Sequence, residues 1–279
     1  MQVRKAVITA AGAGQRNLPM QMLMDQQGKE RSVLSLIVGE ALYAGIDDIC
    51  VVVWPGDEAA YAKLVADQPA RVTFIPQIEP RGYAHSVWCA RDFVGSEGFL
   101  HLVGDHIYVE RGETGSARRL VETAIAEDCA VSGVQITHES ELPNYGAVGG
   151  RQETGKPGIF RIETVLEKPT PTQAEQQLIV PGLRTAHYLC FFGMHVLTPH
   201  ILQIIGDMLA REPKRNVSLS AALAELARRE QYLALIESGG RFDVGVKYGL
   251  FLAQLALGIA GADRDELLTQ VIRVLASND

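Results

Sequence analysis

The stretch AVITAAGAGQRNLP, residues 6–19, runs from an apolar segment directly into a glycine-containing turn with an arginine. A dinucleotide-binding fingerprint requires glycine at position 17, where this chain has Asn17, and a Walker A loop requires Gly-Lys-Ser/Thr. Gly12 and Gly14 still allow the backbone to approach a ligand closely, and Arg16 offers a planar fork for phosphate oxygens. The stretch therefore indicates either another kind of phosphate loop or a tight strand-to-helix turn with a solvated arginine.

The composition favours a globular protein that binds a small molecule. The chain has 279 residues, of which 47% are hydrophobic, and its net charge of −7 argues against binding nucleic acid, which needs a basic face. The four cysteines are scattered and lie in apolar segments, which predicts buried free thiols in a reducing compartment rather than disulfides or a zinc site. We find no signal-peptide pattern and no apolar run long enough for a membrane span, so we expect a cytoplasmic protein.

The first half of the chain alternates short apolar segments with segments of helical periodicity. This pattern predicts an α/β fold with a mixed, mostly parallel sheet and helices on both of its faces. The expected strands are 3–11, 47–54, 71–77, 98–105 and 129–136, and the expected helices are 32–46, 57–67, 83–93 and 116–128. Ser32 is the expected N-cap of its helix, and Gly45 is its expected C-terminal stop. In such sheets, ligands bind at the carboxyl ends of the strands.

The pattern changes in the second half of the chain. Segments 144–151, 157–171 and 185–197 are strand-rich, and we interpret residues 140–190 as an excursion that forms the far wall of a cleft. Residues 200–279 are mainly helical, interrupted by one expected strand at 232–238. Because no linker or repeat divides the chain, we predict one domain, 1–279, with an α/β core over residues 1–200 and a helical C-terminal portion.

Several residues that suit catalysis or binding follow expected strands. Gln77 and Asp105 each lie at a strand end, where ligands bind in such sheets. The carboxylate of Asp105 can hold a divalent cation there while substrate phosphates supply further ligands. Asp243 offers a second carboxylate and Lys247 a nearby cation. For each aspartate the alternative is an ordinary turn or cap residue. The histidines, among them His85, His101 and His106, show no metal-binding spacing, so we expect structural or supporting roles for them.

Glu167 and Lys168 are adjacent at the end of another expected strand. Neighbouring side chains of a strand point to opposite faces, so one can accept hydrogen bonds from sugar hydroxyls while the other approaches phosphate. An exposed Glu-Lys pair before a proline is the alternative interpretation.

Taken in order, these segments resemble the bacterial UTP–glucose-1-phosphate uridylyltransferases, within the wider family of sugar-1-phosphate nucleotidylyltransferases. The resemblance rests on seven ordered landmarks between residues 6 and 250, which are AVITAAGAGQRNLP, EALYAGIDDICVVV, PQIEPRGYAHSVWCARDFVG, LVGDH, YGAV, VLEKPTP and RFDVGVKYGL. It implies the Rossmann-like nucleotide-diphospho-sugar transferase fold. It also implies a Mg²⁺-dependent reaction of UTP with a sugar 1-phosphate that gives a UDP-sugar and pyrophosphate.

The resemblance also implies roles for individual residues on the nucleotide side. The residues expected to bind the nucleotide are Ala11, Gly12, Gly14, Gln77 and Gly82, with Gln77 at an edge of the uracil. Arg16 would handle the triphosphate, and it is one of the three implied catalytic residues, with Asp105 and Lys168. The implied partners are therefore small molecules, neither nucleic acid nor membrane. A homodimer or homotetramer is a further expectation, based on the apolar helices at 246–276.

On the metal and sugar side, the resemblance assigns Asp105 and Asp243 to Mg²⁺. It assigns binding of the sugar to Gly146, Glu167, Lys168 and Lys247, with Lys168 on the phosphate of the sugar.

The glycine-rich loop is where the chain departs from the family pattern. The family loop reads GxGTRxLPxTK and continues into a Pro-Lys-Glu segment, whereas this chain reads GAGQRNLPMQMLMDQQGKE. Gln15 replaces the threonine, and the segment with the phosphate-binding lysine is shortened. Lys29 or Arg31 could replace that lysine from another position. Near the C-terminus, Val246 replaces a second acidic residue. Two alternatives therefore remain, a non-catalytic or weakly active nucleotide-sugar-binding protein and a transferase for another nucleotide or sugar.

Overall fold

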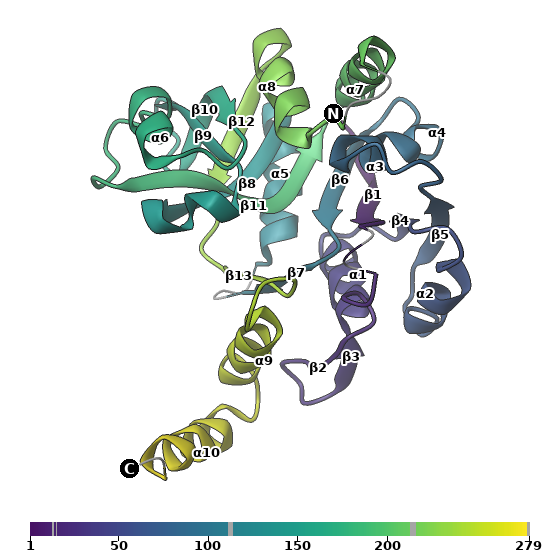
Figure 1. The fold of residues 1–279 in the computed structure, drawn as a ribbon, viewed down its shortest axis with the longest axis vertical. Coiled ribbons are helices and arrows are strands. Elements are labelled where there is room, and N and C mark those ends of the chain that lie inside the picture. Colours follow the sequence, from purple (N-terminus) through teal and green to yellow (C-terminus); the bar gives the residue numbers. More distant parts are fainter. Residues whose placement is uncertain (13, 15, 111–113, 213–215, 278–279) are drawn as a thin grey trace.

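The centre of the molecule is a nine-stranded sheet (Figure 1). It is seen in a computed structural model that describes residues 1–12, 14, 16–110, 114–212 and 216–277. The order of its strands is β5-β4-β1-β6-β11-β8-β12-β10-β9. Their bounds are β1 (Val3–Ala10), β4 (Asp48–Val53), β5 (Arg71–Pro76), β6 (Gly98–Val103), β8 (Ala130–His138), β9 (Ala147–Gln152), β10 (Ile159–Leu166), β11 (His187–Leu197) and β12 (Tyr232–Ile236).

The sheet is mixed, as the sequence predicts. Strands β5, β4, β1 and β6 are parallel neighbours, and β12 is parallel to β8. Strand β11 is antiparallel to β6 and β8, and β10 is antiparallel to β12 and β9. Parallel pairing is thus less dominant than expected, because the long strand β11 returns between β6 and β8. The carboxyl ends of β5, β4, β1 and β6 share one edge.

Helices cover both faces of this sheet, as expected. One face carries α1 (Val33–Tyr43), α2 (Glu58–Leu64) and α5 (Ser116–Glu127), and the other carries α3 (Tyr83–Cys89), α4 (Arg91–Val94), α7 (His200–Arg211) and α8 (Leu219–Arg229). Strand β1 serves both cores, because Ala6 and Ile8 pack on the first face and Val7 packs on the second. Burial on both faces accounts for the continuous apolar run that opens the chain.

Local signals in the sequence place α1 correctly. The Ser32 hydroxyl accepts a hydrogen bond from the Ser35 N–H at 3.0 Å, which satisfies one of the free donors of the first turn. Gly45 has φ +82°, a left-handed conformation that glycine adopts without strain, and it ends the helix. The helix expected at 83–93 is instead divided into α3 and α4, which meet at Ala90.

The excursion around residues 140–190 shares the central sheet through β9, β10 and β11. Two further elements cover it, the 3₁₀ helix η1 (Glu139–Asn144) and α6 (Pro171–Gln177). A small apolar cluster joins them, with Leu142 and Ala174 fully buried beside Tyr188. The single-domain boundaries stay a prediction.

The C-terminal portion contains more strand than expected. Beyond β12, it holds β13 (Gly240–Asp243), which pairs with β7 (His106–Val109). The last two helices, α9 (Gly249–Ile259) and α10 (Arg264–Ala276), extend away from the sheet (Figure 1). A hairpin of β2 (Met22–Met24) and β3 (Glu30–Ser32) lies beside α9, where the Met24 N–H donates to the Gln254 side chain at 2.8 Å.

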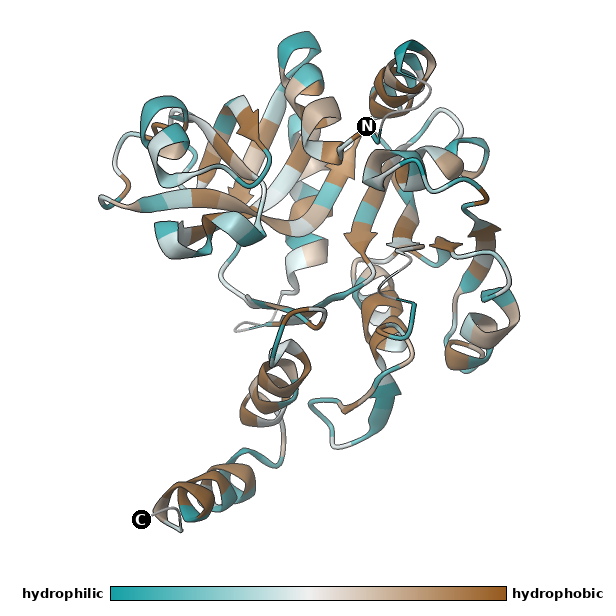
Figure 2. Cartoon of the chain, in the orientation of Figure 1, coloured by the Kyte–Doolittle hydropathy of each residue, from teal (hydrophilic) through white to brown (hydrophobic). Residues whose placement is uncertain are grey.

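The surface of α10 includes exposed apolar residues. Figure 2 shows hydrophobic residues along the central strands and also on α9 and α10. In α10 none of the described residues is buried, and Ile272, Val274 and Leu275 are largely exposed. Within the described part of the chain, no helix combines the length and the apolar character that a membrane span requires.

Candidate active site

The carboxyl ends of the parallel strands open into a pocket of about 470 Å³. The loop after β1 contributes Ala11 and Gly12, the residue after β5 contributes Gln77, and the turn after β6 contributes Asp105. These positions are far apart in the sequence, and parallel pairing of β5 with β4, β4 with β1 and β1 with β6 brings them to one edge. The structure therefore groups them as the alternation of strands and helices predicts.

One side of this pocket is formed by Gln77 and Gly82. Gln77 is buried, and its amide nitrogen donates to the Gly82 carbonyl at 3.3 Å and lies 3.0 Å from His85 Nδ1. Gly82 has φ +93°, and a Cβ on it would lie 2.8 Å from the Val217 carbonyl oxygen. Only glycine fits there, so this wall has a fixed shape and presents backbone to a ligand.

Two carboxylates meet on the opposite side, although they are far apart in the sequence. Asp243 ends β13, and antiparallel pairing of β13 with β7 places it opposite His106, next to Asp105. The ligand atoms of Asp105, His106 and Asp243 all lie within 4.8 Å of one another. The Val244 N–H donates to the Asp105 carbonyl at 2.9 Å, which fixes the two segments together.

This carboxylate pair fits Mg²⁺, which prefers a few carboxylate oxygens and completes its shell with water and phosphate oxygens. His106 is the less suitable ligand for that ion, and its Nδ1 already lies 2.8 Å from Asp105 Oδ1. His106 supports the carboxylate, in line with the supporting role expected for the histidines.

A second, smaller compartment of about 140 Å³ adjoins the first and is lined by Gly146 and Glu167. The Ser220 hydroxyl donates to a carboxylate oxygen of Glu167. A Cβ on Gly146 would lie 2.9 Å from both the Phe191 ring and the Ser220 hydroxyl, so a larger residue would fill this space. The two compartments share Tyr83, Val103, His106 and Asn144.

The backbone turns sharply between Glu167 and Lys168. Lys168 has φ +44°, in the left-handed region, and it lines the first compartment, whereas Glu167 lines the second. The two adjacent side chains thus line different compartments, as expected, but the cause is this turn and not alternation along a strand, because β10 ends at Leu166.

Two predicted cations lie outside the lining of both compartments. Arg16 Nε donates to Asp57 at 2.8 Å, and this hydrogen bond lowers the pKa of the Asp57 carboxyl below its usual value. Lys247 is exposed, with its Nζ 4.9 Å from the centre of the Tyr248 ring. The roles of both residues in binding stay predictions.

The glycine loop is described only in part. Gly14 has open space where a Cβ would stand, and it does not line the pocket among the described residues. Gln15 lies outside the described residues. Lys29 belongs to the β2–β3 turn, and Arg31 forms an ion pair with Asp67 at 2.6 Å. Neither residue lines the pocket.

Sequence reasoning missed a polar cluster beneath the pocket. The Tyr83 hydroxyl and the Thr9 hydroxyl each lie 3.4 Å from Nε2 of His101, which is fully buried. Nearby, Ser132 Oγ lies 2.5 Å from His195 Nδ1. Burial lowers the pKa of His101 well below its usual value and the pKa of His195 to about 3, so both rings are neutral at physiological pH. The signal in the sequence that could have placed Tyr83 in this cluster is its position directly after Gly82.

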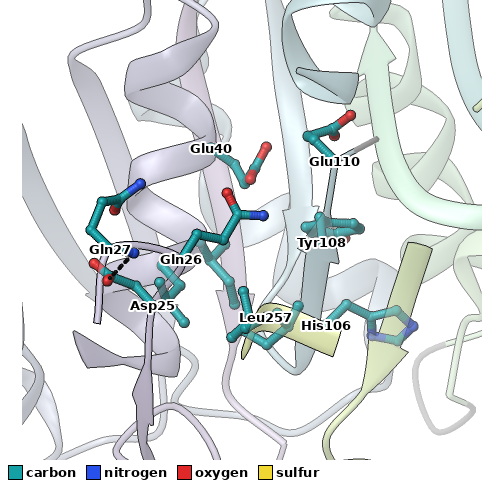
Figure 3. A pocket seen from close by; sticks show the side chains of 11 residues that line it. Asp25, Gln26, Gln27, Glu40, His106, Tyr108, Glu110 and Leu257 are labelled. Atoms are coloured by element: carbon teal, nitrogen blue, oxygen red, sulfur yellow. Dashed lines mark hydrogen bonds between the residues drawn. The ribbon is translucent and has the colours of Figure 1, made fainter. Parts of the chain in front are cut away.

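A second cavity lies on the other side of β7, between α1, the β2–β3 hairpin and α9 (Figure 3). Its outer part has a volume of about 480 Å³ and its inner part about 150 Å³. Figure 3 shows Glu40 and Glu110 on its walls. Burial, and to a lesser extent the charges of Glu110 and Glu237, raise the pKa of Glu40 to about 8. Since Arg31, a cation of its outer wall, is already paired with Asp67, this acidic cavity is unsuited to phosphates.

Comparison with known proteins adds independent information. The model of the nucleotidyl transferase family matches residues 5–258. The chain is 29% identical to UTP–glucose-1-phosphate uridylyltransferase YngB of Bacillus subtilis (strain 168), over 98% of this chain and 95% of that protein. It is 28% identical to a UTP–glucose-1-phosphate uridylyltransferase of Streptococcus pneumoniae, over 98% of this chain and 96% of that protein.

Solved structures share the fold. A UDP-glucose pyrophosphorylase from Acinetobacter baumannii superposes with a TM-score of 0.76 at 22% identity, covering 98% of this chain and all of the other. A UDP-glucose pyrophosphorylase complexed with UDP-glucose superposes with a TM-score of 0.73 at 19% identity, covering 91% and 98% of the two chains. The nucleotide-diphospho-sugar transferase fold expected from the sequence is confirmed.

Proposed function

Since the chain belongs to the nucleotidyl transferase family, we propose that it is a uridylyltransferase that forms UDP-glucose and pyrophosphate from UTP and glucose 1-phosphate. The names of its curated relatives support this substrate pair. One observation carries the proposal. Asp105, Asp243 and Lys168 line the compartment that also contains Gln77 and Gly82, and a smaller compartment with Glu167 adjoins it. Two adjoining compartments suit a nucleotide and a sugar phosphate whose phosphate groups react with each other.

We assign the larger compartment to the nucleotide. Backbone at Ala11, Gly12 and Gly82 packs against the base, and Gln77 hydrogen-bonds an edge of the uracil. Gln77 is suited to this role because it is buried and its amide group is held by Gly82 and His85. A buried amide that pairs with a substrate edge discriminates strongly, because the wrong base leaves it without a partner.

We assign the smaller compartment to the glucose. Glu167 accepts hydrogen bonds from the sugar hydroxyls, and Gly146 leaves room for the ring. Lys168 contacts the phosphate of glucose 1-phosphate from the nucleotide side. The hydrogen bond from Ser220 fixes the Glu167 carboxylate, so it needs no reorganisation when the sugar binds.

Asp105 and Asp243 would hold Mg²⁺, which supplies charge neutralisation for the triphosphate when it is bound. In the transfer itself, a phosphate oxygen of glucose 1-phosphate bonds to the α-phosphorus of UTP. The bond from that phosphorus to the bridging oxygen breaks, and pyrophosphate leaves. The chain forms no covalent bond in this step. It acts by alignment of the two substrates and by placing charge, which are the main sources of rate in phosphoryl-type transfer.

We place the protein in the cytoplasm and expect it to act as a homo-oligomer. All four cysteines are free, and three of them are buried, which suits a reducing compartment. The exposed apolar residues of α9 and α10 suit a contact with a second copy. Sedimentation of the purified protein measures the assembly, and a monomer at micromolar concentration would contradict this expectation.

A single assay tests the proposed reaction. Purified protein is incubated with Mg²⁺, glucose 1-phosphate and each nucleoside triphosphate in turn, and pyrophosphate release is measured. We expect release with UTP. Release with dTTP but not UTP would correct the substrate, and no release with any nucleotide, together with calorimetric binding of UDP-glucose, would indicate a non-catalytic binding protein.

A further inference from the structure

Tyr83 lies at the boundary of the two compartments. It is the first residue of α3 and follows Gly82, and it lines both the nucleotide compartment and the smaller one. Its side chain is large and apolar, yet 39% of the residue is exposed. An aromatic ring left open inside a polar pocket is a candidate contact surface for a ligand.

The hydroxyl end of this side chain is anchored, although the ring is exposed. Its oxygen lies 3.4 Å from Nε2 of His101, and the two ring centres are 5.7 Å apart. His101 belongs to the central strand β6 and is fully buried, and Thr9 of β1 reaches the same nitrogen at 3.4 Å. His101 thus lies next to both hydroxyls, and its contact with the phenol oxygen links the side chain of Tyr83 to the central sheet.

The chemistry of the neighbouring walls indicates what the ring contacts. Gln77 lines the larger compartment and Glu167 the smaller one, and the proposed function makes them the polar partners of the base and of the sugar hydroxyls. The C–H face of a pyranose has no such partner, and it packs favourably on an aromatic ring. Tyr83 lines both compartments, so its ring is available to a sugar that extends from the nucleotide into the smaller one.

We propose that Tyr83 is a positioning residue for the sugar, whose ring packs against the pyranose, and that His101 fixes this ring through its hydroxyl. This inference rests on the proposed function. It adds a residue that sets how the sugar phosphate is aligned with the nucleotide. It also predicts that the contribution of the sugar to binding depends on Tyr83, whereas that of the nucleotide does not.

Binding measurements separate these contributions. Calorimetry gives the affinity for UDP-glucose and the affinity for UDP. The ratio of the two affinities measures the contribution of the sugar to binding. We expect Tyr83→Leu to lower this ratio about tenfold, the size of a lost aromatic contact, and to leave the UDP affinity within about twofold. Tyr83→Phe keeps the ring and loses the anchor, so we expect it to retain most of the ratio.

Steady-state kinetics give a second measurement. For Tyr83→Phe we expect a KM for glucose 1-phosphate about threefold higher, because the ring is no longer held, with the KM for UTP unchanged. A purely structural role would instead lower thermal stability and change both KM values together. Tyr232→Phe is the matched control, because it removes a buried phenol hydroxyl that lies beside Ser132, and Tyr232 lines neither compartment.

The outcomes distinguish the two proposals. If the wild type binds UDP-glucose and Tyr83→Leu keeps the full ratio of the UDP-glucose and UDP affinities, the role of Tyr83 is overturned. The proposed function then stays intact. A wild-type protein that binds neither UDP-glucose nor UDP would overturn the proposed function, and the role of Tyr83 with it.

Discussion

Replacing Glu40 with glutamine removes a carboxyl group from the second cavity (Figure 3). Its Oε2 is buried and has no hydrogen-bond partner among the described residues. Burial is the largest cause that raises the pKa of Glu40, followed by the charges of Glu110 and Glu237, and Arg119 opposes them. Glutamine has the same shape and carries no charge, so Glu40→Gln isolates the effect of ionisation.

The structure gives the sign and the size of the effect. The pKa of Glu40 rises from 4.5 to about 8 on folding, so the native state holds this proton more tightly than the unfolded state. The free energy of unfolding therefore falls as the pH increases between these two values. With ~1.36 kcal/mol for each pKa unit, the destabilisation amounts to ~2 kcal/mol near pH 6 and ~5 kcal/mol near pH 9.

Urea denaturation of both proteins between about pH 5 and pH 9 measures this difference. We expect the free energy of unfolding of the wild type, relative to Glu40→Gln, to fall by ~2.7 kcal/mol between pH 6 and pH 9. Glu225→Gln is the control, because hydrogen bonding to Arg229 lowers the pKa of Glu225, whose titration is complete below this range. A wild type and a Glu40→Gln variant with parallel pH profiles would refute the reasoning.

Three further substitutions test the active site. Asp105→Asn should reduce pyrophosphate release at least ~100-fold, because one of the two carboxylates that fit Mg²⁺ is lost; unchanged turnover across a Mg²⁺ titration would remove Asp105 from the metal site. Gly82→Ala should cost ~1–3 kcal/mol in urea denaturation and weaken UTP binding, since the backbone is left-handed and the new methyl group meets the Val217 carbonyl. Asp57→Asn should free Arg16 and lower the KM for UTP up to ~5-fold, the scale of a surface ion pair; a raised KM would show that Arg16 acts from its place beside Asp57.

Local sequence signals predicted most elements near the site. Ser32 and Gly45 bound α1 because capping and left-handed turns depend on neighbouring residues alone. The continuous apolar strands likewise predicted a sheet covered on both faces, and the positions of Gln77 and Asp105 after strands followed from it. These inferences need no knowledge of distant contacts.

Other features depend on distant contacts and could not be predicted from single segments. Strands β7 and β13 are four residues each, too short for a recognisable period, and only their mutual pairing explains why Asp243 lies beside Asp105. The same holds for Arg16, whose sequence context suggested a phosphate ligand. Its partner Asp57 lies 41 residues further along the chain.

The distribution of charge links the divergent glycine loop to the expected behaviour of the enzyme. Asp105 and Asp243 outnumber Lys168 among the described residues of the nucleotide compartment, so a triphosphate needs cations from elsewhere. We expect Arg16 to be one source, because it is partly exposed in its pair with Asp57 and such exposed pairs contribute at most ~1 kcal/mol. A charge-assisted hydrogen bond to phosphate is stronger, so the exchange of partners favours the nucleotide. We therefore expect the shortened loop, which lacks the phosphate-binding lysine of the family pattern, to lower kcat more than it lowers the affinity for UTP.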